Sequence, residues 1–204
     1  MTSGVNRSHL PLLLIGLLFV AFRILSCIVV DFPPNSAPLA ALFFASTLLA
    51  GRNGVILSTA LFLLSYPLLS LLQGYPVGTD LLTSLLGFGL IVGIATMAGK
   101  LPCHGFIARL TLLLGGSIIS AALFYFLTNT FSWWILPFYD KTATGFYYAQ
   151  WGQHPSLAQP TWHFLRNSLI GNTCFISLLT LAQLRGTALV KYERNSPMKK
   201  NLSV

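Results

Sequence analysis

The stretch of sequence that decides the fold class is Leu81–Gly99, which reads LLTSLLGFGLIVGIATMAG and contains no charged residue. A helix rises about 1.5 Å per residue, so about 20 residues cross the hydrocarbon core of a bilayer. This stretch is close to that length. Because every backbone amide inside a bilayer needs a partner within the protein, a helix is the expected structure. The stretch therefore predicts a membrane-spanning α-helix.

Five further apolar runs flank it, at Leu10–Val30, Ser36–Ala50, Val55–Leu72, Leu110–Thr128 and Arg166–Leu184. Only Ser36–Ala50 is clearly short for a span. This run follows Pro33-Pro34, and it is either a span with little tilt or a broken or re-entrant segment. We predict an all-α integral membrane protein with a single domain, residues 1–184, that forms a bundle of about six transmembrane helices. Residues 185–204 would form a basic cytoplasmic tail.

The composition of the whole chain supports a membrane environment. Of 204 residues, 54% are hydrophobic and 8% are charged, whereas a soluble domain carries about 25% charged residues. The formal net charge of +8 raises nucleic acid as a partner. However, the charges punctuate the apolar runs instead of forming one stripe, as they do in loops between membrane spans. The lipid bilayer is therefore the expected partner, and nucleic acid is not.

The distribution of Lys and Arg predicts the orientation in the membrane. With a cytoplasmic amino terminus, nine of the 12 basic residues fall in cytoplasmic segments, namely Arg7, Arg52, Lys100, Arg109, Arg185, Lys191, Arg194, Lys199 and Lys200. Three of the four acids, Asp31, Asp80 and Asp140, then fall outside. We expect a multi-pass protein of the bacterial inner membrane with both termini in the cytoplasm.

Several runs carry small residues four positions apart, a spacing that lets helix backbones approach closely in lipid. The series are Ala37, Ala41 and Ala45, then Gly89 and Gly93, and finally Gly116 and Ser120. These positions either pack within one bundle or form a docking face for another membrane subunit.

The long connection between the last two runs, within Phe126–Asn172, is rich in Trp and Tyr. Such rings form an aromatic belt at the headgroup level or line a binding pocket. The connection also contains polar groups that are costly at membrane depth unless they face a cavity or a partner. These polar residues are Asn129, His154, His163, Arg166, Asn167 and Asn172.

Helical spacing divides the polar residues of the last run into two groups. In a helix that starts near Pro160, His163, Arg166 and Asn167 share one arc, because they are three and four positions apart. Asn172 lies on a different arc. Arg23, about two turns from the outer end of the first run, either extends to the interface or lines an outward cavity. In a cavity it would favour an anionic or carbonyl-bearing ligand.

Four segments together resemble a known family: NSAPLAALFFA (Asn35–Ala45), FYFLTNTFSWW (Phe124–Trp134), YDKTATGF (Tyr139–Phe146) and RNSLIGN (Arg166–Asn172). They are similar to an uncharacterised bacterial family of transport-type proteins. That family looks like the substrate-binding S components of energy-coupling-factor vitamin transporters. The resemblance implies uptake of a small solute, such as a vitamin or a nucleobase-like compound. It also implies a membrane coupling subunit and ATPase subunits as partners.

By this resemblance the matching site positions are Asn35, Asn129, Trp133 or Trp134, Tyr139 and Asn167. The chain departs from the family pattern in two places within the expected site. Asn172 replaces the Asp that ends the last motif, and Ser65-Tyr66-Pro67 stands where the third span is expected to carry an acid. The alanine series lies in the second run, although S components are expected to present theirs in the first. These departures leave the ligand and the use of a shared energising module open.

Two other classes of function compete with solute binding. One is a structural or assembly subunit of a membrane complex, for which the polar cluster would be incidental. The other is an intramembrane protease that uses Ser117 as nucleophile and His163 as base. Those two residues fall in opposite halves of the bilayer, too far apart for proton transfer. We therefore expect no enzymatic activity.

The sequence indicates no cofactor. It contains no ATP-binding motif of the G-x-x-x-x-G-K-[ST] type, and the four histidines lack metal-ligand spacing. The three cysteines have no CxxC spacing and are expected to be free thiols.

The sequence thus predicts an outward-facing pocket that captures a small solute, with the long connection as a lid. Trp133 or Trp134 would stack on a planar ligand. Asn35, Asn129 and Asn167 would supply hydrogen bonds, and Arg23 or Arg166 would supply positive charge. The remaining candidate site residues are Tyr139, His163 and Asn172.

Overall fold

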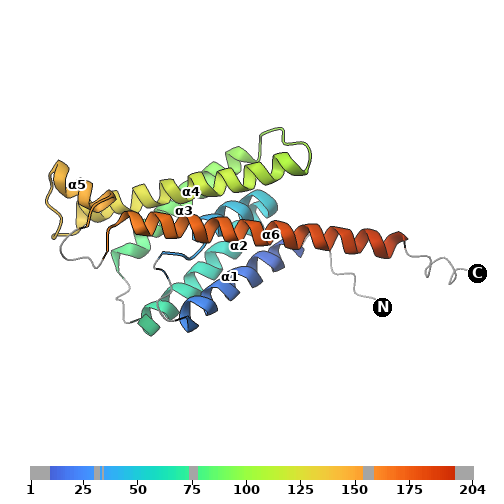
Figure 1. Ribbon diagram of the computed structural model, residues 1–204, viewed down its shortest axis with the longest axis horizontal. Coiled ribbons are helices and arrows are strands. Elements are labelled where there is room, and N and C mark those ends of the chain that lie inside the picture. The colour runs from blue at the N-terminus through green and yellow to red at the C-terminus, as the bar shows by residue number, and fades with distance from the viewer. Residues whose placement is uncertain (1–9, 30–32, 34, 74–77, 154–158, 196–204) are drawn as a thin grey trace, which may run out of the picture.

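The computed structural model describes residues 10–29, 33, 35–73, 78–153 and 159–195. Within these ranges the chain is helical and contains no strand. The helices are α1 (Leu10–Ile28), α2 (Leu39–Gln73), α3 (Thr79–Ala98), α4 (Phe106–Ile135), α5 (Ala143–Gln150) and α6 (Trp162–Asn195). The long helices form an elongated bundle, and α5 covers one end of it (Figure 1).

The helix α2 reverses its direction at Gly51, where the backbone leaves the helical region (φ 54°, ψ −131°). An uninterrupted helix would separate Ser46 from Gly54 by about 12 Å. Instead, a Cβ atom built on Gly54 would lie 1.8 Å from the Ser46 carbonyl oxygen. Farther from the turn, the Phe43 and Phe62 rings meet with their centroids 6.5 Å apart. The two halves of α2 therefore pack against each other as an antiparallel hairpin.

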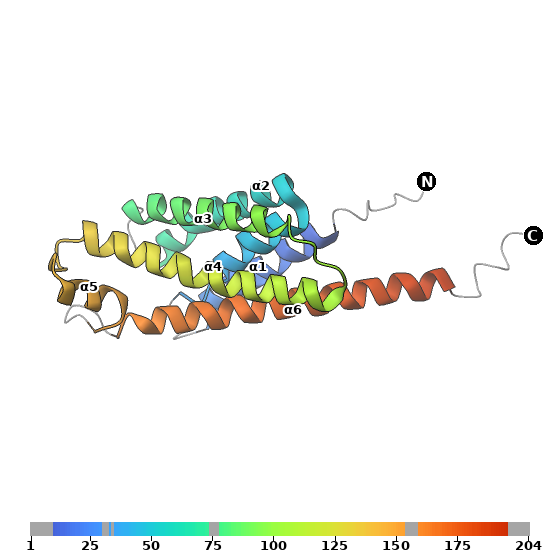
Figure 2. The same cartoon turned by 90° about the horizontal axis from the view of Figure 1, so that it is seen from above.

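The first half of this hairpin is the centre of the bundle. The helix α2 contacts α1, α3, α4 and α6, and Ala41–Ala45 is almost completely buried. On one side these residues pack against Phe19 of α1 and Phe175 of α6 in one apolar cluster. On the other side they pack against Phe88 of α3 in a second cluster. Figure 2 shows α4 between α3 and α6, which closes the bundle.

The three series of small residues have different surroundings. Ala41 and Ala45 are completely buried, and Gly116 of α4 receives the ring of Phe44 where a Cβ would otherwise stand. Both series therefore pack within the bundle. Gly89 and Gly93 of α3 have nothing within 4 Å of a built Cβ. That part of α3 is thus open toward the outside of the molecule.

The outer surface of the bundle is apolar. Large hydrophobic side chains are exposed along the outward faces of several helices, including Leu13, Leu17 and Ile24 on α1 and Ile170, Leu178 and Leu181 on α6. Soluble proteins rarely expose contiguous apolar surface on this scale. By length and composition, three described helical segments, Leu39–Pro67, Leu81–Ala98 and Phe106–Ile135, are long and apolar enough to cross a membrane. The first of them contains the reversal at Gly51, so it forms two shorter antiparallel segments instead of one straight span. A shorter apolar segment, Leu12–Ser26, lies in α1. These features indicate an association with the membrane.

The observed helices differ from the predicted runs in three ways. The runs 36–50 and 55–72 belong to one helix with a reversal, because only Gly51 leaves the helical conformation between them. The helix α6 continues past residue 184 to Asn195, through Ala, Leu, Lys and Arg residues that favour helix. The connection after residue 128 contains the rest of α4 and the additional helix α5.

Candidate functional site

The connection between α4 and α6 has a defined structure around α5. Thr142 is the N-cap residue of α5, and its side-chain oxygen accepts a hydrogen bond from the Gly145 amide at 3.2 Å. Such a cap satisfies a backbone donor that the first turn of a helix leaves free. A Cβ on Gly145 would lie 1.9 Å from the Asp140 carbonyl oxygen, so only glycine permits this close approach. These local contacts position α5 against α4 (Figure 1).

The carboxyl end of α4 is closed by groups from the same connection. Lys141 donates from Nζ to the Trp133 carbonyl and, at 2.8 Å, to the Leu136 carbonyl. A cation is favourable here because the last carbonyls of a helix carry partial negative charge. The Trp133 indole Nε1 donates to the Asp140 carbonyl at 2.9 Å. Trp133 is thus anchored and half-buried, whereas Trp134 is 71% exposed.

Gln150, the last residue of α5, is almost completely buried and connects α5 to α4. Its Nε2 donates to the Thr130 hydroxyl at 3.0 Å and to the Phe126 carbonyl at 3.4 Å. Its backbone carbonyl accepts from the Tyr125 hydroxyl. The buried Thr161 hydroxyl, just before α6, lies 3.0 Å from the Tyr148 carbonyl. A polar junction therefore joins α4, α5 and the start of α6.

Two buried polar atoms at this junction have no hydrogen-bond partner among the described residues. They are the amide nitrogen Nδ2 of Asn129 and the amide oxygen Oε1 of Gln150. The Asn129 side chain makes a contact of hydrogen-bond type with the Tyr125 hydroxyl, although Nδ2 has no partner within strict hydrogen-bond distance and angle. Buried polar atoms are nearly always paired, because an unpaired one loses its hydrogen bond to water without replacement. The junction therefore contains one acceptor, Gln150 Oε1, and one weakly paired donor, Asn129 Nδ2, that packing leaves incompletely satisfied.

The three residues expected on one arc of the last helix have separate partners. Arg166 is exposed, and its Nε and one terminal nitrogen donate to Oδ1 of the buried Asn167 at 3.3 and 3.2 Å. The Arg166 guanidinium also lies over the Trp162 ring, 5.4 Å from its centroid. His163 pairs through Nδ1 with Gln159 Oε1 at 3.4 Å. Arg166 and Asn167 thus form one group, and His163 faces the connection.

Asn172 is completely buried in the centre of the bundle, away from the junction. Its Oδ1 accepts a hydrogen bond of 2.5 Å from the backbone amide of Ala41, and its Nδ2 donates to the Ser168 carbonyl at 2.7 Å. Ala41 lies in the first turn of α2, where backbone amides lack partners within the helix. Asn172 of α6 therefore caps α2 across the bundle.

The two site candidates that come first in the sequence lie apart from the junction. Arg23 of α1 donates to the Ser65 hydroxyl of α2 at 3.2 Å and lies 5.5 Å from the centroid of the Phe19 ring. It therefore contacts the segment where an acid was expected by family resemblance. Asn35 is exposed and has a positive φ of 59°, a conformation that Asn adopts more readily than most residues.

Tyr139 is 5% exposed and packs against Phe138, with ring centroids 4.4 Å apart. Burial raises the pKa of its hydroxyl, because the phenolate would lose solvation. The ring therefore acts as a neutral anchor of the connection near neutral pH.

The structure brings Asn129, Trp133 and Tyr139 into the region of α4 and its following connection. Sequence reasoning missed Gln150, Tyr125 and Thr161, which complete the junction. The Thr142 cap was a usable signal for α5, but nothing local marked Gln150 as a partner of α4. His154 lies outside the described residues.

Other chemistries find little support in the described ranges. These residues contain no group of three His, Cys, Asp or Glu side chains suited to a metal ion. Cys103 and Cys174 are free thiols. Ser117, the nucleophile of the protease alternative, is buried, and its hydroxyl has no described hydrogen-bond partner. No described base therefore contacts it.

Comparison with known proteins identifies one family. Neither the comparison with curated proteins nor the comparison with solved structures found a match. The model of a family of unknown function, DUF6580, matches residues 4–192, and the chain therefore belongs to this family.

Proposed function

We propose that this protein is the substrate-binding subunit of a membrane transport system and captures a small planar solute at the junction of α4, α5 and α6. The observation that carries the proposal is the pair of unpartnered buried atoms, Asn129 Nδ2 and Gln150 Oε1. A donor and an acceptor together are complementary to a lactam or amide edge, which offers one acceptor and one donor in return. Many vitamins and nucleobase-like compounds present such an edge.

The surroundings of these two atoms support a site that opens by movement of α5. This helix has eight residues and packs mainly against α4. Displacement of Gln150 would break its hydrogen bonds to Thr130 and Phe126. The bound solute would replace them, and the adjacent half-buried Trp133 ring would stack on its plane.

The proposed topology places α5 on the outer side of the bacterial inner membrane and both termini in the cytoplasm. The α2 reversal and the connection between α3 and α4 lie at the end of the bundle opposite α5 (Figure 1). Three exposed cations, Arg52, Lys100 and Arg109, lie in or next to these segments, as the preference for cytoplasmic Lys and Arg would require. The resemblance to S components adds a coupling subunit and ATPase subunits as proposed partners. A solute that binds beneath α5 would then enter from outside.

A ligand screen with matched variants tests the solute site. Purified protein in detergent is heated with vitamins, nucleobases and their precursors, and the melting temperature is recorded. A true ligand should stabilise the wild type and Asn53→Ala, which changes an exposed Asn at the opposite end. It should bind Asn129→Ala at least about tenfold more weakly, because one buried hydrogen bond is lost. Equal stabilisation of Asn129→Ala would place the ligand elsewhere and refute this site.

A structural or assembly subunit is the second candidate function. It is favoured by the open surface at Gly89 and Gly93 of α3, because small residues four positions apart let a second helix approach closely. Cross-linking in native membranes distinguishes the two candidates. Specific Gly89→Cys cross-links to another protein, together with no ligand in the screen, would favour the assembly subunit.

A further inference from the structure

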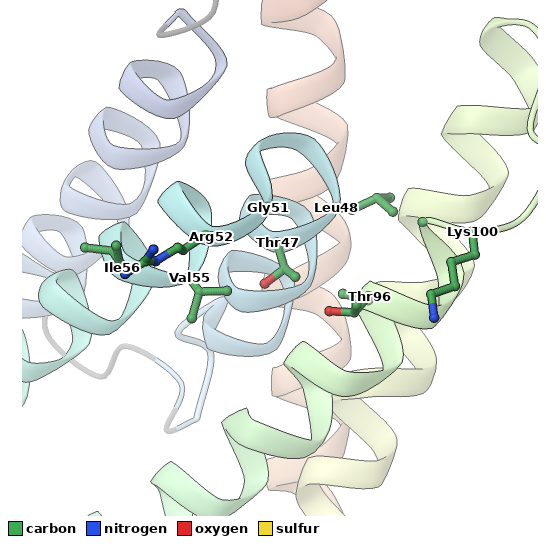
Figure 3. A pocket seen from close by; sticks show the side chains of 10 residues that line it. Thr47, Leu48, Gly51, Arg52, Val55, Ile56, Thr96 and Lys100 are labelled. Atoms are coloured by element: carbon green, nitrogen blue, oxygen red, sulfur yellow. The ribbon is translucent and has the colours of Figure 1, made fainter.

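A pocket opens at the end of the bundle opposite α5, between the α2 reversal and the end of α3 (Figure 3). It has a volume of about 760 Å³. Its lining combines apolar side chains with hydroxyl and cationic groups, and includes Thr47, Arg52, Val55, Ile56, Thr96 and Lys100. The pocket shares no residue with the proposed solute site, so a ligand could bind here whether or not a solute binds at the junction.

The charge of this pocket is positive. Arg52 and Lys100 stand on different sides of it (Figure 3), and no acidic residue is among those that line it. Both cations are exposed at the mouth. An anionic group that entered the pocket would therefore gain attraction from two sides without displacing an internal ion pair.

The Thr47 side chain provides a separate indication of a ligand. Thr47 is 7% exposed, and its Oγ1 has no hydrogen-bond partner among the described residues. In Figure 3 the oxygen lies on the side of Thr47 that is nearer to Val55. The neighbouring Thr96 hydroxyl, in contrast, is already bonded to the Val92 carbonyl at 2.7 Å. Thr47 thus belongs to the lining of the pocket and carries a buried hydroxyl without a described partner.

The pocket lies where a candidate membrane span ends. The candidate span Leu81–Ala98 ends just before Lys100, and Arg52 follows the reversal of the hairpin. Phosphate groups of lipids lie at this level, and acyl chains begin below it. Val55 and Ile56 provide an apolar wall beside the cations. We propose that this pocket binds the headgroup of an anionic phospholipid, with its phosphate near Arg52 and Lys100 and a hydrogen bond from Thr47.

Lipid binding to the purified full chain tests this proposal. Protein in neutral detergent is titrated with phosphatidylglycerol or with phosphatidylcholine of the same acyl chains, and bound lipid is counted by native mass spectrometry. Phosphatidylglycerol should bind more tightly. Arg52→Gln and Lys100→Gln should each weaken it about fivefold, because each cation near a lipid phosphate contributes about 1 kcal/mol. Arg109→Gln removes an exposed cation at the same end but outside the pocket and should change little.

Thr47→Val separates ligand binding from folding. The variant keeps the shape of the side chain and removes a hydroxyl that has no described partner. Its lipid-free stability should equal or exceed that of the wild type, whereas its affinity for phosphatidylglycerol should fall severalfold. Equal affinity for both lipids, an Arg109→Gln effect as large as that of Arg52→Gln, or unchanged affinity in Thr47→Val would overturn the proposal. Equal stabilisation by inorganic phosphate alone would also overturn it, because the site would then recognise a free anion.

Discussion

Asn172 uses both ends of its amide to join two helices. Its oxygen caps the first turn of α2 at Ala41, and its nitrogen bonds to Ser168 one turn earlier in α6. Ala41 lies in the buried centre, where an unpaired backbone amide would be costly. In the pattern of the transport-type family that the sequence resembles, Asp is expected at this position. Its carboxylate also accepts hydrogen bonds, so either residue could cap α2.

This role predicts an order of stability at position 172. Asn172→Leu should lower the free energy of unfolding by about 2 kcal/mol, because it leaves the Ala41 amide unpaired in the core. Asn172→Asp should be milder, since it keeps an acceptor at the positive end of a helix. Thermal unfolding in detergent measures both, with Ser177→Ala on the exposed face of α6 as the control. If Asn172→Leu unfolded at the same temperature as the wild type, the cap would contribute nothing to stability.

At the scale of whole elements, the α2 hairpin organises the bundle. Its first half supplies the buried Ala41–Ala45 segment and its second half packs on that segment. Gly51 permits the reversal because its φ and ψ lie in a region that side chains exclude. Gly54 permits close packing after the turn, because it has no Cβ to meet Ser46.

A pair of Gly→Ala substitutions tests this packing. Gly54→Ala should destabilise the protein by several kcal/mol or prevent its folding, because the new Cβ would overlap backbone atoms of Ser46. Gly89→Ala has open space around it. It should be neutral or stabilising by up to about 1 kcal/mol, since Ala is the better helix former. The melting temperatures of the two variants are measured in detergent. Equal melting temperatures for Gly54→Ala and Gly89→Ala would argue against the hairpin.

At the scale of the whole molecule, the two ends of the bundle differ in chemistry. The α5 end contains aromatic rings, the paired polar groups of the junction and the two unpartnered amide atoms. The opposite end contains Arg52, Lys100 and their pocket. The proposed solute site and the proposed lipid site would therefore lie at opposite ends of the bundle.

The proposed orientation can be checked by labelling cysteines in intact cells. Thr144→Cys, on the exposed surface of α5, should react with a membrane-impermeant maleimide after the outer membrane is opened, in a chain without other cysteines. Cys103, between α3 and α4, should react only after the inner membrane is permeabilised. Labelling of Cys103 before that step, with Thr144→Cys protected, would reverse the assigned topology.

The positions of the helices could be predicted from sequence because hydropathy and charge are local properties. Each long apolar run contains few or no charged residues, so its composition favours the bilayer without reference to the rest of the chain. Boundaries were less predictable. The α2 reversal takes only one non-helical residue, Gly51, and α6 extends beyond its apolar part.

The candidate site depended on the tertiary structure, because pairing and burial arise only when distant segments pack. The sequence marked Asn129 and Trp133 through their polar and aromatic character. Only the packing of α5 on α4 brought Gln150 near them, and only the contact of α6 with α2 gave Asn172 its partner at Ala41. The sequence by itself determined which segments suit a membrane. The tertiary structure decided which polar groups are satisfied, because a hydrogen bond depends on atoms that are far apart along the chain.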